Sequence, residues 1–400
     1  MNFLEKLLDG VAVKWKPLGE LGEFVRGSGL QKSDFTDSGI GCIHYGQIYT
    51  FYGDYAYQTK SFVSSILATK LRKAQKNDLI IATTSENIED VCKTLVWLGE
   101  EEVCVSGETY IFKHNQNPKY LAYCLKTPHF FDFKKRNRTG TKVIRVHGDR
   151  LATFQIPIPC PDNPEKSLAI QAEIVRILDT FTELTAELTT ELTTELTDRK
   201  KQYNYYRDRL LTFEEGEVEW KTLGEVAIIG TGSRNTNEAV LKGKYPFFVR
   251  SQEPRAINEY EFDETAIITA GDGVGVGKVF HFISEKYALH QRAYRIVVTT
   301  GDIMPKFLFH FIRFNFSQYL ATTSVHASVT SLRKPMFEKY PVPVPPPTEQ
   351  ARIVAILDKF DTLTTSIREG LPREIALRQK QYEYYRDLLL TFPKPEEVEA

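Results

Sequence analysis

Apolar positions recur with a helical period through residues 167–213, a stretch that contains no Gly and no Pro. In its middle the pair Glu-Leu returns every four residues, which places Leu184, Leu188, Leu192 and Leu196 on one slowly turning stripe. A stretch of this length predicts a single helix of about 70 Å, at about 1.5 Å per residue. Its leucine stripe predicts a seam for a partner helix.

The partner helix is predicted within the same chain. Residues 350–392 repeat the pattern of residues 171–213 at a constant offset of 179 and without a gap. Unlike the first copy, the second contains Gly370-Leu371-Pro372, which should end or kink the helix and restart it with proline in its first turn. The matching positions include Gln171/Gln350, Leu178/Leu357, Asp179/Asp358, Phe181/Phe360, Tyr206/Tyr385 and Phe213/Phe392.

The duplication extends to the borders of each half. Trp15 and Trp220 open the similar segments WKPLGE and WKTLGE, and proline-rich segments at 156–161 and 340–345 precede the two helices. Because proline cannot continue a hydrogen-bonded ladder and fixes its own φ, we expect these segments to be rigid exits. Between the borders the two halves share little sequence, which suggests one scaffold that presents two different readers. The expected domains are a first globule (1–160), a first long helix (161–213), a second globule (214–346) and a second long helix with a tail (347–400).

Both globules alternate short apolar or aromatic runs with polar turns, a pattern that predicts strands. A short helix opened by a proline is expected at 118–133 in the first globule, and another helix near 305–316 in the second. We therefore expect an α/β or α+β fold, with a twisted sheet in each of two similar globules. The predicted strands include residues 41–45, 78–82, 108–112, 245–249, 266–269 and 294–298.

Composition narrows the class of protein. The chain is 42% hydrophobic over 400 residues, which is enough for two or three cores, and its net charge is −1, so any basic surface must be local. Its five cysteines form no CxxC pair, which argues against a disulfide framework or a zinc ribbon. The first 20 residues carry charges and lack an apolar run, so we expect neither a signal peptide nor a membrane span. A soluble protein of the reducing cytoplasm fits these features.

Motifs for catalysis fail on spacing. The glycine-rich segment 271–278 matches neither a phosphate-binding loop nor a dinucleotide fingerprint, and it is expected to be a hairpin that lets backbone approach closely. Pro161-Asp162 and Asp198-Arg199-Lys200 resemble a nuclease set, but a long stretch of helix separates them, so they cannot share a metal ion. We find no histidine–carboxylate metal set, no nucleophile elbow and no adenine-methyltransferase motif. The chain is expected to be non-catalytic and to bind no cofactor or metal itself.

A local signal for nucleic acid does occur. Residues 134–142 are rich in Lys, Arg and Thr, contain no acid and follow an aromatic cluster, and residues 322–334 hold the equivalent place in the second half. Lys and Arg neutralise phosphates, while Arg and Gln can bond guanine and adenine edges. Taken singly, a charge run is more often a solvated surface. The candidate DNA contacts are Gln31, Lys32, Ser33, Thr84, Ser85, Asn87, Lys134, Lys135, Arg136, Arg138, Thr139 and Lys142 in the first globule, and Arg234, Arg250, Arg255, Gln291, Arg292, His326, Ser328, Arg333 and Lys334 in the second.

A second surface is suggested by the repeated motif QKQYxYYRD. Its tyrosines, among them Tyr206 and Tyr385, lie at helical spacing beside leucines. Aromatic side chains with a polar tip suit the edge of a protein interface. Stacking on bases is one role open to these rings, but their helical spacing favours packing within the scaffold or under a partner protein.

The borders as a whole resemble the conserved regions of type I restriction–modification specificity subunits, most like those of the IC class. The segments that carry the resemblance are LEKLLDGV (4–11), IPIPCPDNPEKSLAIQ (156–171), RKKQYNYYRDRLLTF (199–213), EGEVEWKTLGE (215–225) and LPREIALRQKQYEYYRDLLLTF (371–392), together with the Glu-Leu repeats.

The resemblance implies two target-recognition domains held apart by two antiparallel helices, in pseudo-twofold duplicated halves. Each domain would read one half of a bipartite site in double-stranded DNA. Two modification subunits would supply S-adenosylmethionine binding and adenine methylation, and restriction subunits would supply ATP- and Mg-dependent translocation and cleavage. The chain itself would have none of these activities.

Two other classes of protein compete with this interpretation. A coiled-coil adaptor whose globular ends bind proteins explains the helices equally well, but it does not explain two diverged globules with basic segments inside matched borders. An autonomous nuclease would have to cut DNA by itself in the presence of a metal ion.

Overall fold

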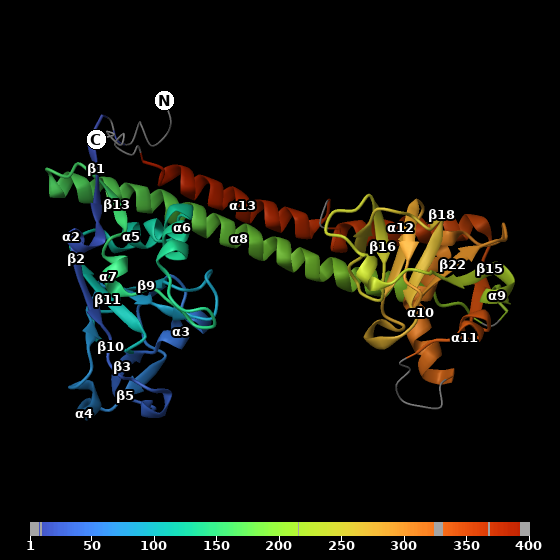
Figure 1. The fold of residues 1–400 in the computed structure, drawn as a ribbon, viewed down its shortest axis with the longest axis horizontal. Coiled ribbons are helices and arrows are strands. Elements are labelled where there is room, and N and C mark those ends of the chain that lie inside the picture. Colours follow the sequence, from blue (N-terminus) through green and yellow to red (C-terminus); the bar gives the residue numbers. More distant parts are fainter. Residues whose placement is uncertain (1–7, 9, 215, 324–330, 367–368, 393–400) are drawn as a thin grey trace. The chain divides into compact units, whose positions relative to one another are not determined.

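The computed structural model describes residues 8, 10–214, 216–323, 331–366 and 369–392 of the chain. The chain divides into two compact units. Unit 1 comprises Met1–Leu188 and Leu377–Ala400, and unit 2 comprises Thr189–Ala376. Each unit therefore contains one of the two predicted globules, and each takes helical segments from both copies of the sequence repeat. In Figure 1 the strands of unit 1 are blue to green and those of unit 2 yellow to orange.

The globule of unit 1 contains two larger sheets, whereas the sequence pattern predicted one. Parallel pairing joins β3 to β10 and β4 to β9, within otherwise largely antiparallel sheets. In spatial order, the first sheet consists of β2 (Gly22–Arg26), β11 (Thr109–His114), β7 (Leu79–Ala82), β9 (Lys93–Trp97) and β4 (Tyr55–Ala56), and the second of β5 (Ser61–Val63), β3 (Ile40–Ile43), β10 (Val103–Val105) and β6 (Lys73–Ala74). Two short strands, β8 (Thr84–Ser85) and β12 (Ile144–Arg145), pair beside them.

A side-chain cap divides one predicted helix of unit 1. The helix predicted at 118–133 is two helices, because Thr127 caps a new start by accepting a hydrogen bond from Phe130 N, and Pro128 occupies the first turn. The second of these helices reaches Asn137 and so incorporates part of the basic run. The short helical elements are α2 (Leu18–Leu21), η1 (Lys32–Asp34), α3 (Tyr45–Thr50), α4 (Ser65–Ala68), α5 (Pro118–Cys124), α6 (Pro128–Asn137) and α7 (Gly148–Leu151).

Unit 2 repeats this plan. Its two larger sheets are β15 (Ala227–Thr231), β22 (Ala293–Val298), β19 (Ala266–Ala270) and β20 (Phe280–Ile283), and β17 (Arg255–Ile257), β16 (Tyr245–Phe248), β21 (Lys286–Leu289) and β18 (Phe262–Asp263). Its helical elements are α9 (Leu223–Val226), η2 (Thr236–Glu238), η3 (Gly273–Gly275), α10 (Pro305–Thr323), α11 (Lys334–Glu338) and α12 (Pro347–Thr365). The parallel pair β16 and β21 corresponds to β3 and β10 of unit 1.

The proline-rich segments form strands, so their interpretation as exits without a ladder is wrong. β13 (Gln155–Pro159) pairs with β1 (Val13–Pro17), and β23 (Pro341–Val344) pairs with β14 (Glu219–Thr222), both antiparallel. Their prolines stand at every second residue, and alternate backbone nitrogens of a strand point to the same side. All the missing N–H groups can therefore face away from the partner in a two-stranded ribbon.

The long helix is confirmed. Helix α8 (Pro164–Leu210) runs for 47 residues and contributes to both units. Its counterpart is interrupted as predicted, since α12 ends at Thr365 and α13 (Leu371–Leu389) starts with Pro372 in its first turn. In unit 1 the helices run antiparallel, because Thr182 bonds Tyr382 while Phe181 contacts Tyr385.

Burial along the leucine stripe is uneven. Leu188, Leu192 and Leu196 are half-buried, whereas the side chain of Leu184 remains 50% exposed. The stripe therefore does not form a continuously buried seam within this chain, and the prediction for Leu184 is wrong. Deeper burial occurs at the globules, where α8 packs Ile174 and Leu178 into the core of unit 1.

Each globule completes its core with residues from both copies of the helical repeat. In unit 1, Leu178 of the first copy and Leu390 of the second share one core. In unit 2, Leu357 of the second copy and Leu211 of the first do the same. The two copies have therefore exchanged partners, and neither unit is built from a continuous half of the sequence.

Candidate nucleic-acid interface

A common backbone frame underlies both globules at one end of their parallel strands. In unit 1, Ser106 N donates to Ile43 O over 3.1 Å, and in unit 2 His290 N donates to Phe248 O over 2.9 Å. These bonds join the loop after the second parallel strand to the end of the first. The equivalence extends to the sheet register, since Val105 pairs with Ile43 as Leu289 pairs with Phe248.

Further backbone hydrogen bonds are also equivalent in the two globules. Thr83 N donates to Glu108 O over 3.1 Å in unit 1, and Gly271 N donates to Arg292 O over 2.9 Å in unit 2. The next segment is also matched, because Val146 N donates to Thr83 O as Leu332 N donates to Gly271 O, over 3.1 and 2.7 Å. These shared hydrogen bonds therefore match positions of the two globules that a comparison of their sequences does not match. The aligned positions are Tyr45 with Arg250, Thr84 with Asp272, Glu108 with Arg292 and Arg145 with Ser331.

Asp272 of unit 2 lies between two of the candidate arginines. Its Oδ1 accepts from Arg250 Nη1 over 2.6 Å, and its Oδ2 accepts from Arg292 Nη1 over 3.2 Å. Burial acts to raise the pKa of the Asp272 carboxyl, but the two guanidinium groups outweigh burial and lower it. The carboxylate is therefore charged and holds both arginines in place. Sequence inspection selected the arginines and missed the acid.

Other candidates of unit 2 surround this cluster. Arg255 lines the same pocket of about 380 Å³ as Arg250 and Asp272. Gln291 Nε2 donates to Asn235 Oδ1 over 2.5 Å, in the loop beside Arg292. The structure therefore brings together candidates that are far apart in the sequence.

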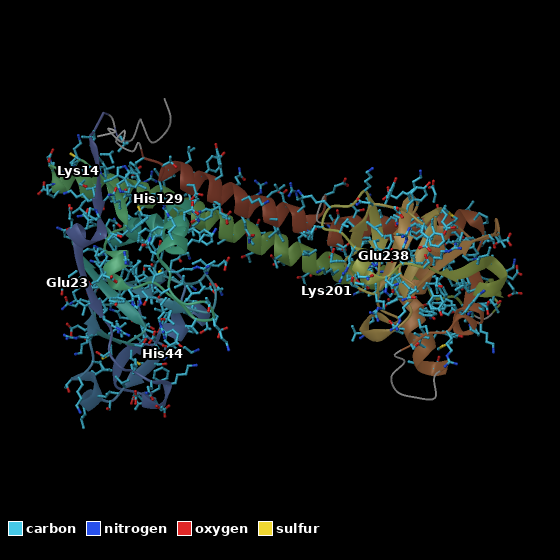
Figure 2. All side chains as sticks on the ribbon, viewed as in Figure 1. Lys14, Glu23, His44, His129, Lys201 and Glu238 are labelled. Carbon is cyan, nitrogen blue, oxygen red and sulfur yellow. The ribbon has the colours of Figure 1, made fainter. Side chains whose placement is uncertain are left out.

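Arg234 differs from the other arginines. Hydrogen bonds from its guanidinium to Glu238 and Glu259, both over 3.0 Å, raise its pKa. Glu238 closes η2 (Figure 2), where it also accepts from Asn235 N. With two carboxylates already bound, Arg234 is engaged in holding the loop, which argues against its assignment as a DNA contact.

In unit 1 the corresponding end of the sheet carries another set of side chains. Thr84 Oγ1 donates to Glu108 Oε2 over 2.5 Å, and Arg145 Nε lies 3.6 Å from the same oxygen. Thr84 is 8% exposed, so it supports Glu108 rather than facing solvent. Arg145 was missed because it stands alone in the sequence after the basic run. His44, labelled in Figure 2, follows β3 at this end of the sheet.

The remaining polar candidates of this globule stabilise their own loops or lie exposed. Asn87 Nδ2 donates to Asp90 Oδ2 over 2.8 Å, and Ser85 Oγ accepts from Asn87 N over 3.4 Å. Gln31 caps η1, and Lys32 and Ser33 follow it as exposed residues.

The basic run of unit 1 is divided by the end of helix α6. The candidate contacts in it that lie exposed are Lys135, Arg136, Arg138, Thr139 and Lys142. Lys135 Nζ lies 4.5 Å from the centroid of the Phe131 ring, which holds the ammonium over the aromatic cluster. Thr139 and Arg145 exchange backbone hydrogen bonds of 2.8 and 2.9 Å, so the segment folds back beside Thr84. These residues form a local basic surface next to the end of the sheet.

Lys134 is not part of that surface, and its selection as a DNA contact is wrong. It is 6% exposed, and its Nζ donates to Glu89 O over 2.7 Å and to Val91 O over 3.0 Å. Burial lowers the pKa of its ammonium group. Its helical position turns it inward, toward the loop of residues 89–91, while Lys135 and Arg136 turn outward.

In the matching segment of unit 2, His326 and Ser328 lie outside the described residues. Arg333 and Lys334 are exposed at the start of α11. Lys334 Nζ lies 3.5 Å from Glu338 Oε1, an exposed ion pair that leaves the ammonium accessible. Both residues stay candidates for phosphate contacts.

One buried glutamine fixes each globule to its helix, a role that the sequence pattern did not reveal. Gln171 Oε1 accepts from Asn117 N over 3.0 Å, and Gln350 Oε1 accepts from Met304 N over 2.7 Å. Both side chains are fully buried. Their equal spacing in the repeat was visible, but their partners at the starts of α5 and α10 were not.

A pair of aspartates extends these anchors. Asp179 accepts from Lys119 Nζ over 2.6 Å and from Tyr123 Oη over 2.8 Å. Asp358, its counterpart, lies 2.7 Å from His310 Nε2. Burial lowers the pKa of His310 although Asp358 acts to raise it. Both globules are thus held on their helices through polar contacts at equivalent positions of the repeat.

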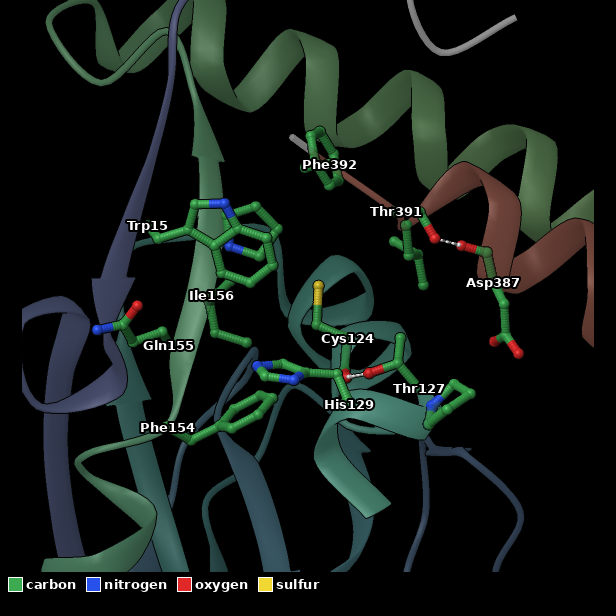
Figure 3. A pocket seen from close by; sticks show the side chains of 13 residues that line it. Trp15, Cys124, Thr127, His129, Phe154, Gln155, Ile156, Asp387, Thr391 and Phe392 are labelled. Carbon is green, nitrogen blue, oxygen red and sulfur yellow. Dashed lines mark hydrogen bonds between the residues drawn. The ribbon is translucent and has the colours of Figure 1, made fainter. Parts of the chain in front are cut away.

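One apolar pocket lies away from these polar groups. A pocket of about 230 Å³ in unit 1 is lined by Trp15, Cys124, His129, Phe154 and Phe392, among others (Figure 3). None of the candidate DNA contacts lines it. It belongs to the packing between the first globule and the end of the C-terminal helical segment.

The described part of the chain offers neither a metal site nor a membrane-spanning helix. Among those residues, no group of three or more His, Cys, Asp or Glu side chains could hold a metal ion. No helix there is both long and apolar enough to cross a membrane. All five cysteines are free, and burial raises the pKa of Cys92 and Cys124 to about 12.

Comparison with known proteins gives consistent matches. The family model described as "Type I restriction modification DNA specificity domain" matches residues 12–198 and 215–377. The type I restriction enzyme EcoR124I/EcoR124II specificity subunit of Escherichia coli is 38% identical, over 100% of this chain and 99% of that protein. The EcoprrI specificity subunit of Escherichia coli is 34% identical, over 92% of each chain.

Solved structures agree on the fold. A chain from a structural study of complex assembly and conformational transition of the type I R-M system matches with a TM-score of 0.64, at 15% identity, over 94% of this chain and 97% of that one. The HsdS subunit from Thermoanaerobacter tengcongensis matches with a TM-score of 0.51, at 14% identity, over 94% and 95%.

Proposed function

Because the chain belongs to the type I restriction–modification DNA specificity family, we propose that its two units each read one half of a bipartite site in double-stranded DNA. Its role is DNA recognition, and it is a specificity subunit rather than a catalytic one. The alternatives of an adaptor and an autonomous nuclease find no support in these matches. Assignment to the IC class is not specified by them and stays a prediction.

One observation carries the proposal of two separate readers. The same backbone hydrogen bonds build the end of the sheet in both globules, but the side chains placed there differ in charge. Glu108 of unit 1 takes the position of Arg292 in unit 2, and Thr84 takes that of Asp272. Base edges in the major groove differ in their donors and acceptors. A constant frame with different polar groups is what two different half-sites require.

The helical segments supply a surface for modification subunits. Tyr205 and Tyr384 occupy equivalent positions of the repeated motif and are 58% and 64% exposed. Exposed tyrosines next to aliphatic residues are enriched at protein interfaces. Since the motif occurs twice, we infer two docking sites for two modification subunits.

Cofactors and further partners belong to the rest of the assembly. S-adenosylmethionine would be bound by the modification subunits, and ATP and Mg by restriction subunits. Such an enzyme acts on cellular DNA, so a cytoplasmic location follows from this function.

The test is co-expression with the modification subunit in a host without other adenine methylation. Sequencing of methylated adenines should give a bipartite, asymmetric motif only when both proteins are present. Methylation by the modification subunit alone at the same motif would remove this chain from recognition. Cleavage of DNA by the chain alone would instead support the nuclease.

A further inference from the structure

We propose that Arg250 and Arg292, positioned by Asp272, read guanine in the half-site that unit 2 recognises. This inference rests on the proposed function, because it assumes that unit 2 contacts base edges. The three residues stand at the ends of β16, β19 and before β22, where the backbone frame shared with unit 1 places them together.

The assignment to guanine rests on the guanidinium N–H donors of both arginines that do not bond Asp272. Each guanidinium has five N–H donors, and only Nη1 of each arginine donates to Asp272. Among the residues that the structure describes, no other side chain or backbone group bonds either guanidinium. Each arginine therefore keeps two neighbouring donors for a bidentate contact. Guanine offers two acceptors, N7 and O6, on its major-groove edge, whereas adenine and thymine each offer one.

The arginines are accessible and yet restrained. Their side chains are 41% and 62% exposed, for Arg250 and Arg292, while that of Asp272 is 23% exposed. His290 lies behind them at 5% exposure, and its Nδ1 accepts from Arg292 N over 3.0 Å. An arginine whose guanidinium is already held by an aspartate loses less side-chain entropy on binding than a free arginine does.

Glycines of the segment 271–278 make this arrangement possible. A Cβ on Gly271 would lie 2.7 Å from Arg292 O, and a Cβ on Gly275 would lie 2.6 Å from Arg250 O. Any other residue would push the loop that carries Asp272 away from both arginines. The glycine-rich hairpin predicted from the sequence therefore brings its acid close to the chain's own backbone.

Unit 1 forms the same backbone frame with other side chains in place of this ion cluster. At the positions of Arg250, Asp272 and Arg292 it has Tyr45, Thr84 and Glu108, within the same backbone hydrogen bonds. The ion pair of unit 1 in this frame joins Glu108 to Arg145, which takes the position of Ser331. Two arginines around one acid are therefore an arrangement of unit 2, while the charges of unit 1 are placed differently, as two different half-sites would require.

The experiment uses the complete chain co-expressed with its modification subunit. Variants R250A, R292A and D272N are compared with R352A, a matched control that removes an exposed, ion-paired arginine on α12 of the same unit. Each arginine variant should reduce the preference for guanine at one position of the unit 2 half-site by roughly 5- to 150-fold. D272N should weaken both positions together, because Asp272 positions both arginines. R352A should leave the motif unchanged.

The half-site of unit 1 serves as the internal control for folding and assembly, since it should stay intact in all variants. A half-site of unit 2 without any G·C pair would overturn the inference. So would arginine variants that lower methylation evenly without relaxing any position, which is the behaviour of phosphate contacts. Failure of the proposed function would be distinguishable from failure of this inference, because the wild-type chain would then direct no bipartite methylation at all.

Discussion

The ring of Phe181 lies against that of Tyr385, with centroids 5.8 Å apart and an interplanar angle of 30°. The equivalent pair with the roles of the copies reversed is Phe360 against Tyr206, at 5.7 Å and 27°. Each unit thus joins the phenylalanine of one sequence copy to the tyrosine of the other. The duplication is therefore expressed as reciprocal contacts between its two copies.

This reciprocal pairing should be measurable as a coupling energy. In a double-mutant cycle of Phe181→Ala and Tyr385→Ala, we expect a coupling of about 0.5–1.5 kcal/mol in the free energy of unfolding, as for other aromatic pairs. The Tyr384 ring contacts Tyr385 rather than Phe181, so a cycle of Phe181→Ala with Tyr384→Ala is the control. Equal coupling in both cycles would show that the ring pair has no special role.

Lys134 and Lys135 should have opposite effects although they are adjacent. Lys134→Ala removes two hydrogen bonds from a buried ammonium, each worth on the order of 1.5–3 kcal/mol, and should lower the thermal stability of the chain. Lys135→Ala removes an exposed charge and should leave stability nearly unchanged. Thermal unfolding of the two variants checks this, and an equal loss in both would contradict the inward position of Lys134.

The exposed basic surface should act through phosphates. Replacing Lys135, Arg136 and Arg138 by Ala should weaken DNA binding by the assembled methyltransferase at low salt. The slope of log binding constant against log salt should fall by about 0.9 for each lost contact. Titrations at several salt concentrations measure the slope, and an unchanged slope would remove this surface from the interface. Lys134 is left intact here, so that stability does not confound the result.

Helix α8 should act as a ruler between half-sites. Deleting Thr189 to Leu192 removes about 6 Å of helix and rotates the residues beyond the deletion by about 40°, at about 3.6 residues per turn. One base pair of DNA rises about 3.4 Å and turns about 34–36°. We expect the unspecified spacer to shorten by one base pair with both half-sites unchanged, as deformable DNA absorbs the difference in rise.

Deleting only two residues should impair assembly, because it rotates the half-buried Leu196 away from its present face. Sequencing of methylated adenines reports spacer and half-sites together for both deletions. An unchanged spacer in an active four-residue deletion would rule out the ruler.

Regular features could be predicted from the sequence because their causes are local. The long helix follows from an uninterrupted period, and the break before Leu371 from Gly370 and Pro372. Strands with alternating prolines were mispredicted, because proline excludes a ladder only on the side where its missing N–H would be needed.

Functional positions were harder to predict because their contacts are long-range. A run of basic residues does not show which member a helix turns inward, so Lys134 was grouped with its exposed neighbours. Arg250 and Arg292 were selected singly, but Asp272 between them follows from the pairing of β16 with β21 and of β19 with β22. The sequence thus indicated the composition of the recognition site, while its geometry required the sheet register.

The most direct test of two independent readers exchanges one of them. Residues 20–155 would be replaced by the matching region of another specificity subunit whose methylated site is known, and the chimaera would be co-expressed with the modification subunit. Sequencing of methylated adenines should show one new half-site beside one unchanged half-site. Loss or alteration of both half-sites in a soluble, assembled complex would contradict the account.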